Sequence, residues 1–312
     1  MKVLITGIAG FIGFHTALKF KANGHEVCGF DNYNTYYDPK LKHQRTGILV
    51  DNGITVHYND LTHTHDGDVS SLIGKFQPDL VIHLAAMAGV RYSMDHPKEY
   101  EHNNIYGTEL LIKALEKHNV KNVIYASTSS VMNGNPVPWN EDAELPVQKS
   151  PYGVSKVANE NQFHESKISN AVGLRFFTVY GPWGRPDMAL FDFTKNILAD
   201  HHITLFNYGD MKRDFTYIDD IVQGIVLVAD NMTERDIYCI GYGKQVELQT
   251  FLTHIESNLF KVARIKYAPM HPADAPETFS DTTKLQKLGY KPTTPIEVGV
   301  KNFIDWYKDH YL

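Results

Sequence analysis

The sequence predicts a doubly wound α/β fold with a parallel central sheet, joined to a second, smaller α/β lobe. Short apolar strand-like runs alternate with helical or loop stretches, and the first run passes through a glycine-rich turn into a helix. The runs cover residues 2–6, 26–30, 54–58, 79–84, 122–127 and 172–177. Alternation of this kind is typical of βαβ units, whose strands are parallel.

The first turn has the pattern of a dinucleotide-binding (Rossmann) turn. It contains Gly7, Gly10 and Gly13, and a helix is expected over residues 14–22. Glycine allows a tight turn and a close approach to a pyrophosphate, and the helix N-terminus then faces the phosphates. The second strand ends at Asp31, an acid placed to bind an adenosine ribose and to repel a 2′-phosphate. We therefore predict NAD rather than NADP, against the alternative of a merely flexible loop.

Length and breaks in the pattern predict two domains. With 312 residues, 43% of them hydrophobic and 21% charged, the chain can bury a substantial core. The strand and helix rhythm stops at residues 182–186, which contain two prolines. We predict an NAD-binding domain over residues 1–180 and a substrate-binding domain over 181–312. An apolar helix expected over 216–228 suggests that residues 216–240 return to the first domain.

Composition argues against several classes of partner. A net charge of −6 gives no basic surface for nucleic acid or anionic membranes, and no apolar run approaches the roughly 20 residues of a membrane helix. The start runs directly into a strand without a signal peptide, so we expect a cytoplasmic protein. Cys28 and Cys239 are expected to be buried thiols. The histidine pairs 63/65 and 201/202 lack clustered carboxylates or cysteines, so no metal is predicted.

Tyr152 and Lys156 are four residues apart, a spacing that suits a tyrosine whose proton is lost beside a lysine. Ser150 and Pro151 are suited to the N-cap and first position of a helix, which would carry both side chains on one face. A phenol titrates near pH ~10, so a base working near pH ~7 needs a shift of about three units, or roughly 4 kcal/mol. The electrostatic effect of a nearby ammonium in a poorly solvated cleft is large enough to produce this shift. The alternative is a solvated surface pair.

Two further stretches follow predicted strands at the sheet edge where such folds bind ligands. Residues 126–130, Ala-Ser-Thr-Ser-Ser, would project hydroxyl groups there, and residues 84–86, Leu-Ala-Ala, would let a cofactor lie close. An ordinary polar loop and an ordinary packed turn are the alternatives. Asn103 and Asn104, poor helix formers within a helical stretch, are expected to make a specific hydrogen bond.

Together these features resemble the extended short-chain dehydrogenase/reductase family, specifically its sugar-nucleotide epimerases and dehydratases, over nearly the whole chain. Within it the sequence is most similar to the UDP-glucuronate 4-epimerase subfamily. The matching stretches are residues 31–34, 36–38, 88–93, 174–190 and 211–220. The resemblance implies that Thr128, Tyr152 and Lys156 are catalytic and that the active form is a homodimer. With Tyr152 and Lys156, the implied NAD contacts are Gly7, Gly10, Phe11, Ile12, Gly13, Asp31, Asn32, Asp60, Leu61, Leu84, Ala85 and Ala86.

The implied reaction inverts C4 of a UDP-hexuronic acid, UDP-glucuronate to UDP-galacturonate, through a transient 4-keto sugar and tightly bound NAD. The ketone is β to the C6 carboxylate, so carbon dioxide is easily lost unless the carboxylate is held. Ser129, Ser130, Thr178 and Arg185 are the candidates for that role. Related decarboxylases have a glutamate where Ser130 stands, and 4,6-dehydratases have an Asp-Glu pair where Ser129 and Ser130 stand. Without these acids, dehydration lacks its proton shuttle, and epimerisation is the simplest chemistry.

The second domain is expected to bind the nucleotide. By resemblance, Phe206 stacks on uracil, Arg213 pairs with the pyrophosphate and Asp274 binds a ribose hydroxyl, while Arg91 lies near the sugar. The plainer alternatives are that Phe206 is a core residue and that Arg213 is bridged to Asp214 or Asp219. Asp274 would then be a turn residue, and Arg91 a surface arginine.

Three residues depart from the subfamily. Met132 replaces a tyrosine that often lines the pocket, and Met87 and His271 stand where glutamine is usual. These changes leave open another UDP-sugar 4-epimerase, acting on UDP-galacturonate, UDP-glucose or an N-acetylated sugar, and a UDP-glucuronate decarboxylase. A non-catalytic NAD-binding sensor is also left open, although such proteins tend to lose the tyrosine or the lysine that this chain keeps.

Overall fold

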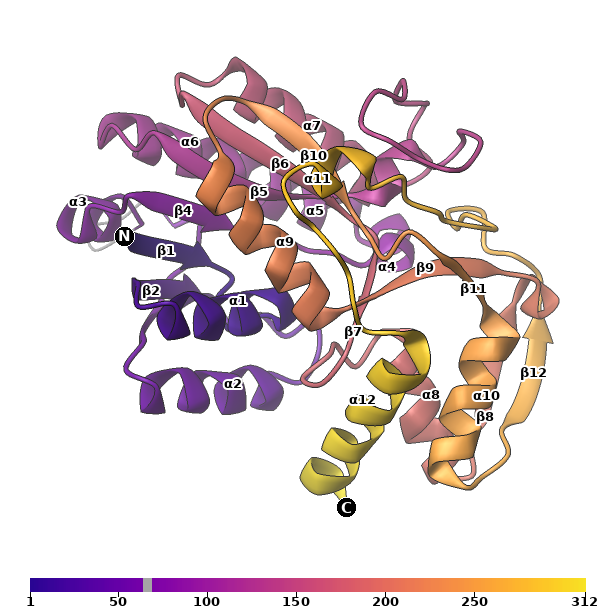
Figure 1. Cartoon of the computed structure of the whole chain (residues 1–312). Coiled ribbons are helices and arrows are strands. Elements are labelled where there is room, and N and C mark those ends of the chain that lie inside the picture. Colours follow the sequence, from indigo (N-terminus) through magenta and orange to yellow (C-terminus); the bar gives the residue numbers. More distant parts are fainter. Residues whose placement is uncertain (64–68) are drawn as a thin grey trace.

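The computed structural model describes residues 1–63 and 69–312 and confirms the doubly wound parallel fold (Figure 1). Among these residues, seven strands form one sheet in the order β10-β6-β5-β4-β1-β2-β3, with every neighbouring pair parallel. Its strands are β1 Lys2–Thr6, β2 Glu26–Asp31, β3 Thr55–Tyr58, β4 Leu80–His83, β5 Asn122–Thr128, β6 Asn170–Phe176 and β10 Asp236–Ile240. His65, of the first histidine pair, lies outside the described residues.

Helices cover both faces of the large sheet because its strands are apolar on both sides. The helices that pack these faces are α1 Phe11–Ala22, α2 Lys40–Asp51, α3 Val69–Phe76, α6 Gly107–Lys117, α7 Pro151–Glu165 and α9 Ile218–Asn231. In β1, Val3 and Ile5 belong to the core cluster packed by α1, α2 and α9, whereas Leu4 points into the cluster packed by α3, α6 and α7. The sheet is therefore buried between two helical layers.

The remaining elements form a smaller unit at the carboxyl edge of the large sheet (Figure 1). A three-stranded sheet has the order β11-β9-β7, and β8 pairs with β12 in parallel. These elements are β7 Thr178–Tyr180, α8 Ala189–Leu198, β8 His202–Phe206, β9 Lys212–Tyr217, β11 Gln245–Glu247, α10 Leu248–Leu259, β12 Arg264–Ala268 and α12 Ile296–Tyr311. The short helix α11 Thr283–Gln286 packs instead against β10 of the large sheet. The helix expected over 216–228 instead begins at Ile218, because β9 continues through Tyr217. The division at residue 180 stays a prediction.

Short irregular helices bring polar side chains to the edge of the sheet. They are α4 Val90–Asp95, α5 Pro97–Tyr100, the π-helix η1 Glu101–Tyr106 and the 3-10 helices η2 Ser129–Met132 and η3 Asn207–Gly209. Within η1, buried Asn104 accepts a hydrogen bond from the Met87 amide (2.8 Å) and donates to the Met87 carbonyl (3.0 Å) and the Ser155 hydroxyl (2.9 Å). The hydrogen bond expected of Asn104 is confirmed, and it ties the loop after β4 to α7.

Two other sequence-based expectations concern membrane helices and thiols. None of the described helices has the length and apolar character needed to cross a bilayer. Cys28 and Cys239 are both free and buried, and burial raises the pKa of the Cys28 thiol to about 12. Both thiols therefore pack as small apolar side chains.

Half-buried His15 makes the fold sensitive to acid. Its ring Nε2 lies 3.0 Å from the Pro182 carbonyl oxygen, and burial lowers its pKa to about 4. Unfolded histidine binds its proton near pH ~6.5, so the unfolded chain gains protons first as the pH falls. His15 alone is expected to cost about 2 kcal/mol of stability between pH ~7 and pH ~4.5.

We therefore expect His15→Gln, whose amide can still donate to Pro182, to lose less stability between these two pH values than the unmodified chain. The measurement is the free energy of urea unfolding at each pH. His164→Gln, at a histidine whose side chain is 76% exposed, serves as the control. Equal acid sensitivity of the His15 variant and the unmodified chain would contradict this account.

Candidate active site

A cavity of about 890 Å³ opens where the carboxyl ends of the large sheet meet the smaller unit. Every residue predicted to be catalytic, cofactor-binding or substrate-binding lines this one cavity. The residues of the large sheet and its loops are Gly7, Gly10, Phe11, Ile12, Gly13, Asp31, Asn32, Asp60, Leu61, Leu84, Ala85, Ala86, Arg91, Thr128, Ser129, Ser130, Tyr152 and Lys156. The later residues are Thr178, Arg185, Phe206, Arg213 and Asp274. The structure thus brings them together, and their individual roles stay predictions.

The glycine turn has no room for side chains. Gly7 has a φ of +68°, and a Cβ there would lie 2.8 Å from backbone atoms of Ala85, while a Cβ at Gly13 would lie 2.3 Å from the Gly7 carbonyl oxygen. Helix α1 begins at Phe11, three residues earlier than expected, and its cap, Gly10, has no side chain to satisfy the first N–H groups. These groups stand at the cavity wall, so the turn fits a diphosphate.

Two carboxylates stand beside this turn. Asp31, at the end of β2, accepts a hydrogen bond from the Tyr33 amide (2.8 Å), and the Lys42 ammonium lies 3.6 Å from its carboxylate. Asp60 accepts hydrogen bonds from Asn32 Nδ2 and the Thr62 amide, both at 2.8 Å. The carboxylate of Asp31 and the open helix end beside it fit the ribose and phosphates of a dinucleotide.

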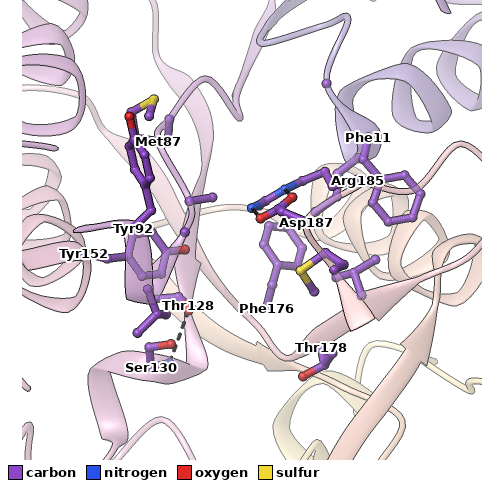
Figure 2. Close-up of a pocket in the computed structure, with 18 of the residues that line it drawn as sticks. Phe11, Met87, Tyr92, Thr128, Ser130, Tyr152, Phe176, Thr178, Arg185 and Asp187 are labelled. Atoms are coloured by element: carbon purple, nitrogen blue, oxygen red, sulfur yellow. Dashed lines mark hydrogen bonds and ion pairs between the residues drawn. The ribbon is translucent and has the colours of Figure 1, made fainter. Parts of the chain in front are cut away.

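Tyr152 lies close to Thr128 in the cavity (Figure 2), and Lys156 lines the same cavity. Ser150 Oγ accepts a hydrogen bond from the Gly153 amide (3.1 Å), which confirms the expected N-cap of α7. The helix presents both residues toward β5, which ends at Thr128. The Thr128 hydroxyl makes a side-chain hydrogen bond with the Tyr152 phenol and also accepts one from the Ser130 amide (3.2 Å).

The electrostatics of this cluster differ from the simple picture of a lysine that acidifies a tyrosine. Burial raises the pKa of Tyr152, and the Thr128 hydrogen bond and the charge of Arg185 only partly oppose it. Burial lowers the pKa of Lys156 to about 8, opposed by Glu160. The Lys156 ammonium donates to the Ala126 carbonyl (2.9 Å). The protein alone therefore does not ionise the phenol, because desolvation outweighs the charges around it.

Two of the carboxylate-binding candidates, Thr178 and Arg185, lie across the cavity from Tyr152, whereas Ser130 lies beside Thr128 on the Tyr152 side (Figure 2). Arg185 donates to Asp187 from Nε (3.0 Å) and from its terminal nitrogen (2.5 Å). The Tyr36 hydroxyl donates to the same carboxylate (2.9 Å), and burial raises the pKa of Tyr36 to about 12. The guanidinium expected to face a substrate is therefore already paired, and Asp187 links the loop after β2 to the loop after β7.

The nucleotide-binding candidates form two separate contacts. Arg91 pairs with Asp274 (2.7 Å), and its guanidinium carbon lies 3.7 Å from the centre of the Phe206 ring. Arg213 donates instead to the backbone carbonyls of Ala275 (2.8 Å) and Pro276 (3.1 Å). The expected alternative for Arg213, a bridge to Asp214 or Asp219, is not the observed arrangement. Arg91 is likewise more than an isolated surface arginine.

The three departures from the subfamily have different surroundings. Met87 lines the cavity and packs against Tyr100 and Tyr152. Met132 is fully buried in a cluster with Trp139 and Phe177, and it is these two aromatic side chains that line the cavity. The expectation that an aromatic is simply missing from the pocket was thus incomplete. His271 is outside the lining, where its Nδ1 accepts a hydrogen bond from the Ala273 amide (3.2 Å).

Sequence reasoning missed several charged residues at this site. Lys42, Asp187 and Glu160 are all buried or half-buried beside predicted residues, yet each comes from an ordinary-looking stretch of sequence. The signal available was helical spacing for Glu160, one turn beyond Lys156. Asp187, by contrast, stands in a loop and meets Tyr36 from far along the chain, so no local pattern marks it.

Comparisons with known proteins agree with this geometry. Residues 3–241 match the family described as the NAD-dependent epimerase/dehydratase family. A probable UDP-glucuronate 4-epimerase of Rhizobium meliloti is 37% identical over 100% of this chain and 98% of its own length.

Two solved structures show the same likeness. A UDP-glucuronic acid 4-epimerase from Bacillus cereus, in complex with UDP-glucuronic acid and NAD, superposes with a TM-score of 0.93 at 34% identity, and 100% of each chain is covered. A UDP-glucose 4-epimerase from Thermus thermophilus, in complex with NAD, has a TM-score of 0.86 at 27% identity, covering 99% of this chain and 100% of its own.

The glycine turn generates a direct test. Gly13→Ala places a methyl group against the Gly7 carbonyl, so α1 has to shift and its first N–H groups leave their positions. We expect at least a roughly tenfold loss of dinucleotide affinity, equivalent to about 1.4 kcal/mol. The measurement is calorimetric titration of NAD. Gly47→Ala in α2, where a Cβ meets open space, is the matched control; an unchanged affinity in the Gly13 variant would contradict the assignment.

Proposed function

The chain belongs to the NAD-dependent epimerase/dehydratase family, and we propose that it is a UDP-hexuronate 4-epimerase that interconverts UDP-glucuronate and UDP-galacturonate. The observation that carries the proposal is the meeting of Tyr152, Lys156 and Thr128 with the glycine turn in one cavity. The same cavity also contains a set of hydroxyl groups and a guanidinium suited to a carboxylate. The glycine turn would hold NAD, and the bound cofactor would supply hydride acceptor and donor chemistry at C4 of the sugar.

The proton chemistry belongs to Tyr152. Its phenol oxygen takes the proton of the sugar 4-hydroxyl as C4 is oxidised and gives it back as C4 is reduced, so no proton is consumed. Thr128, hydrogen-bonded to the phenol, is placed to donate to the oxygen on which charge develops. Lys156 supplies positive charge behind them and is placed to orient the cofactor ribose. Because burial raises the pKa of Tyr152, ionisation of its phenol depends on the charges that surround it in the assembled site.

The same cavity limits side reactions. Ser129 and Ser130 supply hydroxyl groups but no carboxyl group where a dehydratase would need an acid and a base. With Thr178 and Arg185, they are our proposed contacts for the C6 carboxylate, which must be held out of alignment with the C4 ketone. Arg91, Phe206, Arg213 and Asp274 are the proposed nucleotide contacts. The chemistry supported best is therefore epimerisation without decarboxylation or loss of water.

A UDP-glucose 4-epimerase is the second candidate. The observation that favours it is the pairing of Arg185 with Asp187, which reduces the positive charge offered to a uronate. The Thermus thermophilus relative shows that the fold also serves that substrate.

We also propose that the chain acts as a homodimer through helices of the large-sheet unit, and in the cytoplasm. Exposed apolar side chains on η1 and α7, Tyr106 (40% exposed) and Val154 (51%), support such an interface.

The function is tested by product analysis. The purified protein is denatured and its supernatant analysed for NAD by mass spectrometry, and the native protein is incubated with UDP-glucuronate and followed by nuclear magnetic resonance of anomeric protons. We expect UDP-galacturonate to appear. UDP-xylose would instead indicate a decarboxylase, turnover of UDP-glucose alone the second candidate, and bound NAD without turnover of any UDP-sugar a sensor.

Replacing the proposed base gives a sharper prediction. Tyr152→Phe removes the hydroxyl but keeps the ring packed against Tyr100, so the fold and bound NAD should be retained. We expect kcat to fall roughly a thousandfold, the size typical of a lost acid–base group. Tyr267→Phe, at a 55% exposed tyrosine of β12 outside the cavity lining, is the control. Full turnover by the Tyr152 variant would exclude the mechanism.

The pairing of Arg185 generates a prediction on specificity. Asp187→Asn leaves Arg185 without its carboxylate partner and free to meet a substrate carboxylate. We expect kcat/KM for UDP-glucuronate, relative to that for UDP-glucose, to rise about fivefold, or ~1 kcal/mol. Asp305→Asn, which breaks an exposed pair with Lys301, is the control. An equal change for both sugars would argue against a role for Arg185 in reading the carboxylate.

A further inference from the structure

A buried carboxylate lies one helical turn beyond Lys156. Glu160 belongs to α7, and its side chain is only 6% exposed. The spacing of four residues places it on the same face of the helix as Lys156. Burying an ionised carboxylate is costly unless charged or hydrogen-bonded partners surround it. Its partners therefore indicate what the residue does.

Those partners come from the strands that carry the catalytic cluster. Arg175 in β6 donates to both carboxylate oxygens of Glu160, from Nε and from a terminal nitrogen, each at 2.9 Å. Ser127 in β5 donates its hydroxyl to the same carboxylate at 2.5 Å. Because side chains alternate along a strand, Ser127, whose hydroxyl meets Glu160, and the next residue, Thr128, point to opposite faces of β5. The Glu160 carboxylate thus holds the carboxyl end of β5 from the face opposite to Thr128.

Lys156 is held by the same strand. Its ammonium donates to the carbonyl of Ala126, the residue before Ser127. Glu160 opposes the effect of burial on Lys156, since its charge favours the ammonium form. Consecutive residues of β5 are therefore bound to Lys156 and to Glu160, and the next carries the catalytic hydroxyl.

The other titratable groups around this network are neutral near pH ~7. His83 in β4, which faces Lys156, has its pKa lowered to about 3 by burial. Burial raises the pKa of Tyr125 in β5 and of Cys239 in β10, which face Glu160 and Arg175. Arg175 also donates to the Glu141 backbone carbonyl (3.3 Å). Among the described residues, Glu160 is the group whose negative charge acts on Lys156.

We propose that Glu160 is a positioning residue for the reaction, which keeps Lys156 in its ammonium form and holds the Ser127–Thr128 strand end against α7. The inference rests on the proposed function for its catalytic consequence, although the charge state of Lys156 is independent of turnover. Arg175 has a different part: it allows the carboxylate to be buried, and it acts on Lys156 only through Glu160. Removing the charge of Glu160 and removing that of Arg175 should therefore have different effects on Lys156.

The test compares two variants that break the same ion pair. Glu160→Gln removes the charge beside Lys156, whereas Arg175→Met leaves that charge and the Ser127 contact in place. Titration of Lys156 is followed in the NAD-loaded protein by the ¹³Cε resonance of labelled lysine, assigned by its loss in Lys156→Arg. The pH dependence of kcat is measured on the same samples. Turnover by the unmodified protein shows separately whether the proposed function holds.

We expect the titration midpoint of Lys156, and the alkaline limb of kcat, to move down by about one pH unit in Glu160→Gln and not to move down in Arg175→Met. If Glu160→Gln does not fold, the Glu160→Gln/Arg175→Met double variant, which buries no charge at the pair, should show the same downward movement. Equal movement in the two single variants, or an unmoved Lys156 resonance in whichever Glu160 variant folds, would overturn the proposal.

Discussion

A lysine, a glutamate and an arginine are buried together behind the catalytic surface, where water does not solvate them. Lys156 is satisfied by a carbonyl of β5, and Glu160 by Arg175 and Ser127. Two of these bonds join α7 to β5 and the third joins α7 to β6, so the three elements cannot slide past one another without leaving a buried charge unpaired. The position of Tyr152 relative to Thr128 follows from that constraint.

A neutral network holds the neighbouring part of the sheet. The Thr6 hydroxyl accepts hydrogen bonds from the amides of Leu84 (3.2 Å) and Ala85 (3.1 Å) and lies 2.7 Å from His83 Nδ1. The other ring nitrogen of His83 is 3.1 Å from the Thr108 hydroxyl. Because the imidazole is uncharged, it fixes β1 to β4 without adding a second cation near Lys156. The glycine turn and the proposed catalytic residues are thus aligned by two separate sets of bonds.

Local sequence patterns predicted what depends on neighbouring residues. The six expected strands, the N-cap at Ser150 and the close packing at Gly13 all follow from side-chain size, turn chemistry and periodicity. The partners of the charged groups could not be predicted from these local patterns. Lys156 was expected to act on Tyr152 directly, yet its ammonium meets a backbone carbonyl, which carries no sequence signal. Asp187 meets Tyr36 across 151 positions of sequence, a contact that only the folded chain defines.

The charged network has a consequence for how the protein assembles. Ala126, Ser127, Lys156, Glu160 and Arg175 all belong to the single unit β5-α7-β6, whereas the cofactor cradle gathers residues from Gly7 to Ala85. Closing a short loop costs little chain entropy, so contacts within one such unit are accessible early in folding. The buried charges are in this sense a compact module, whose bonds are complete within one β-α-β unit and use no residue of the glycine turn.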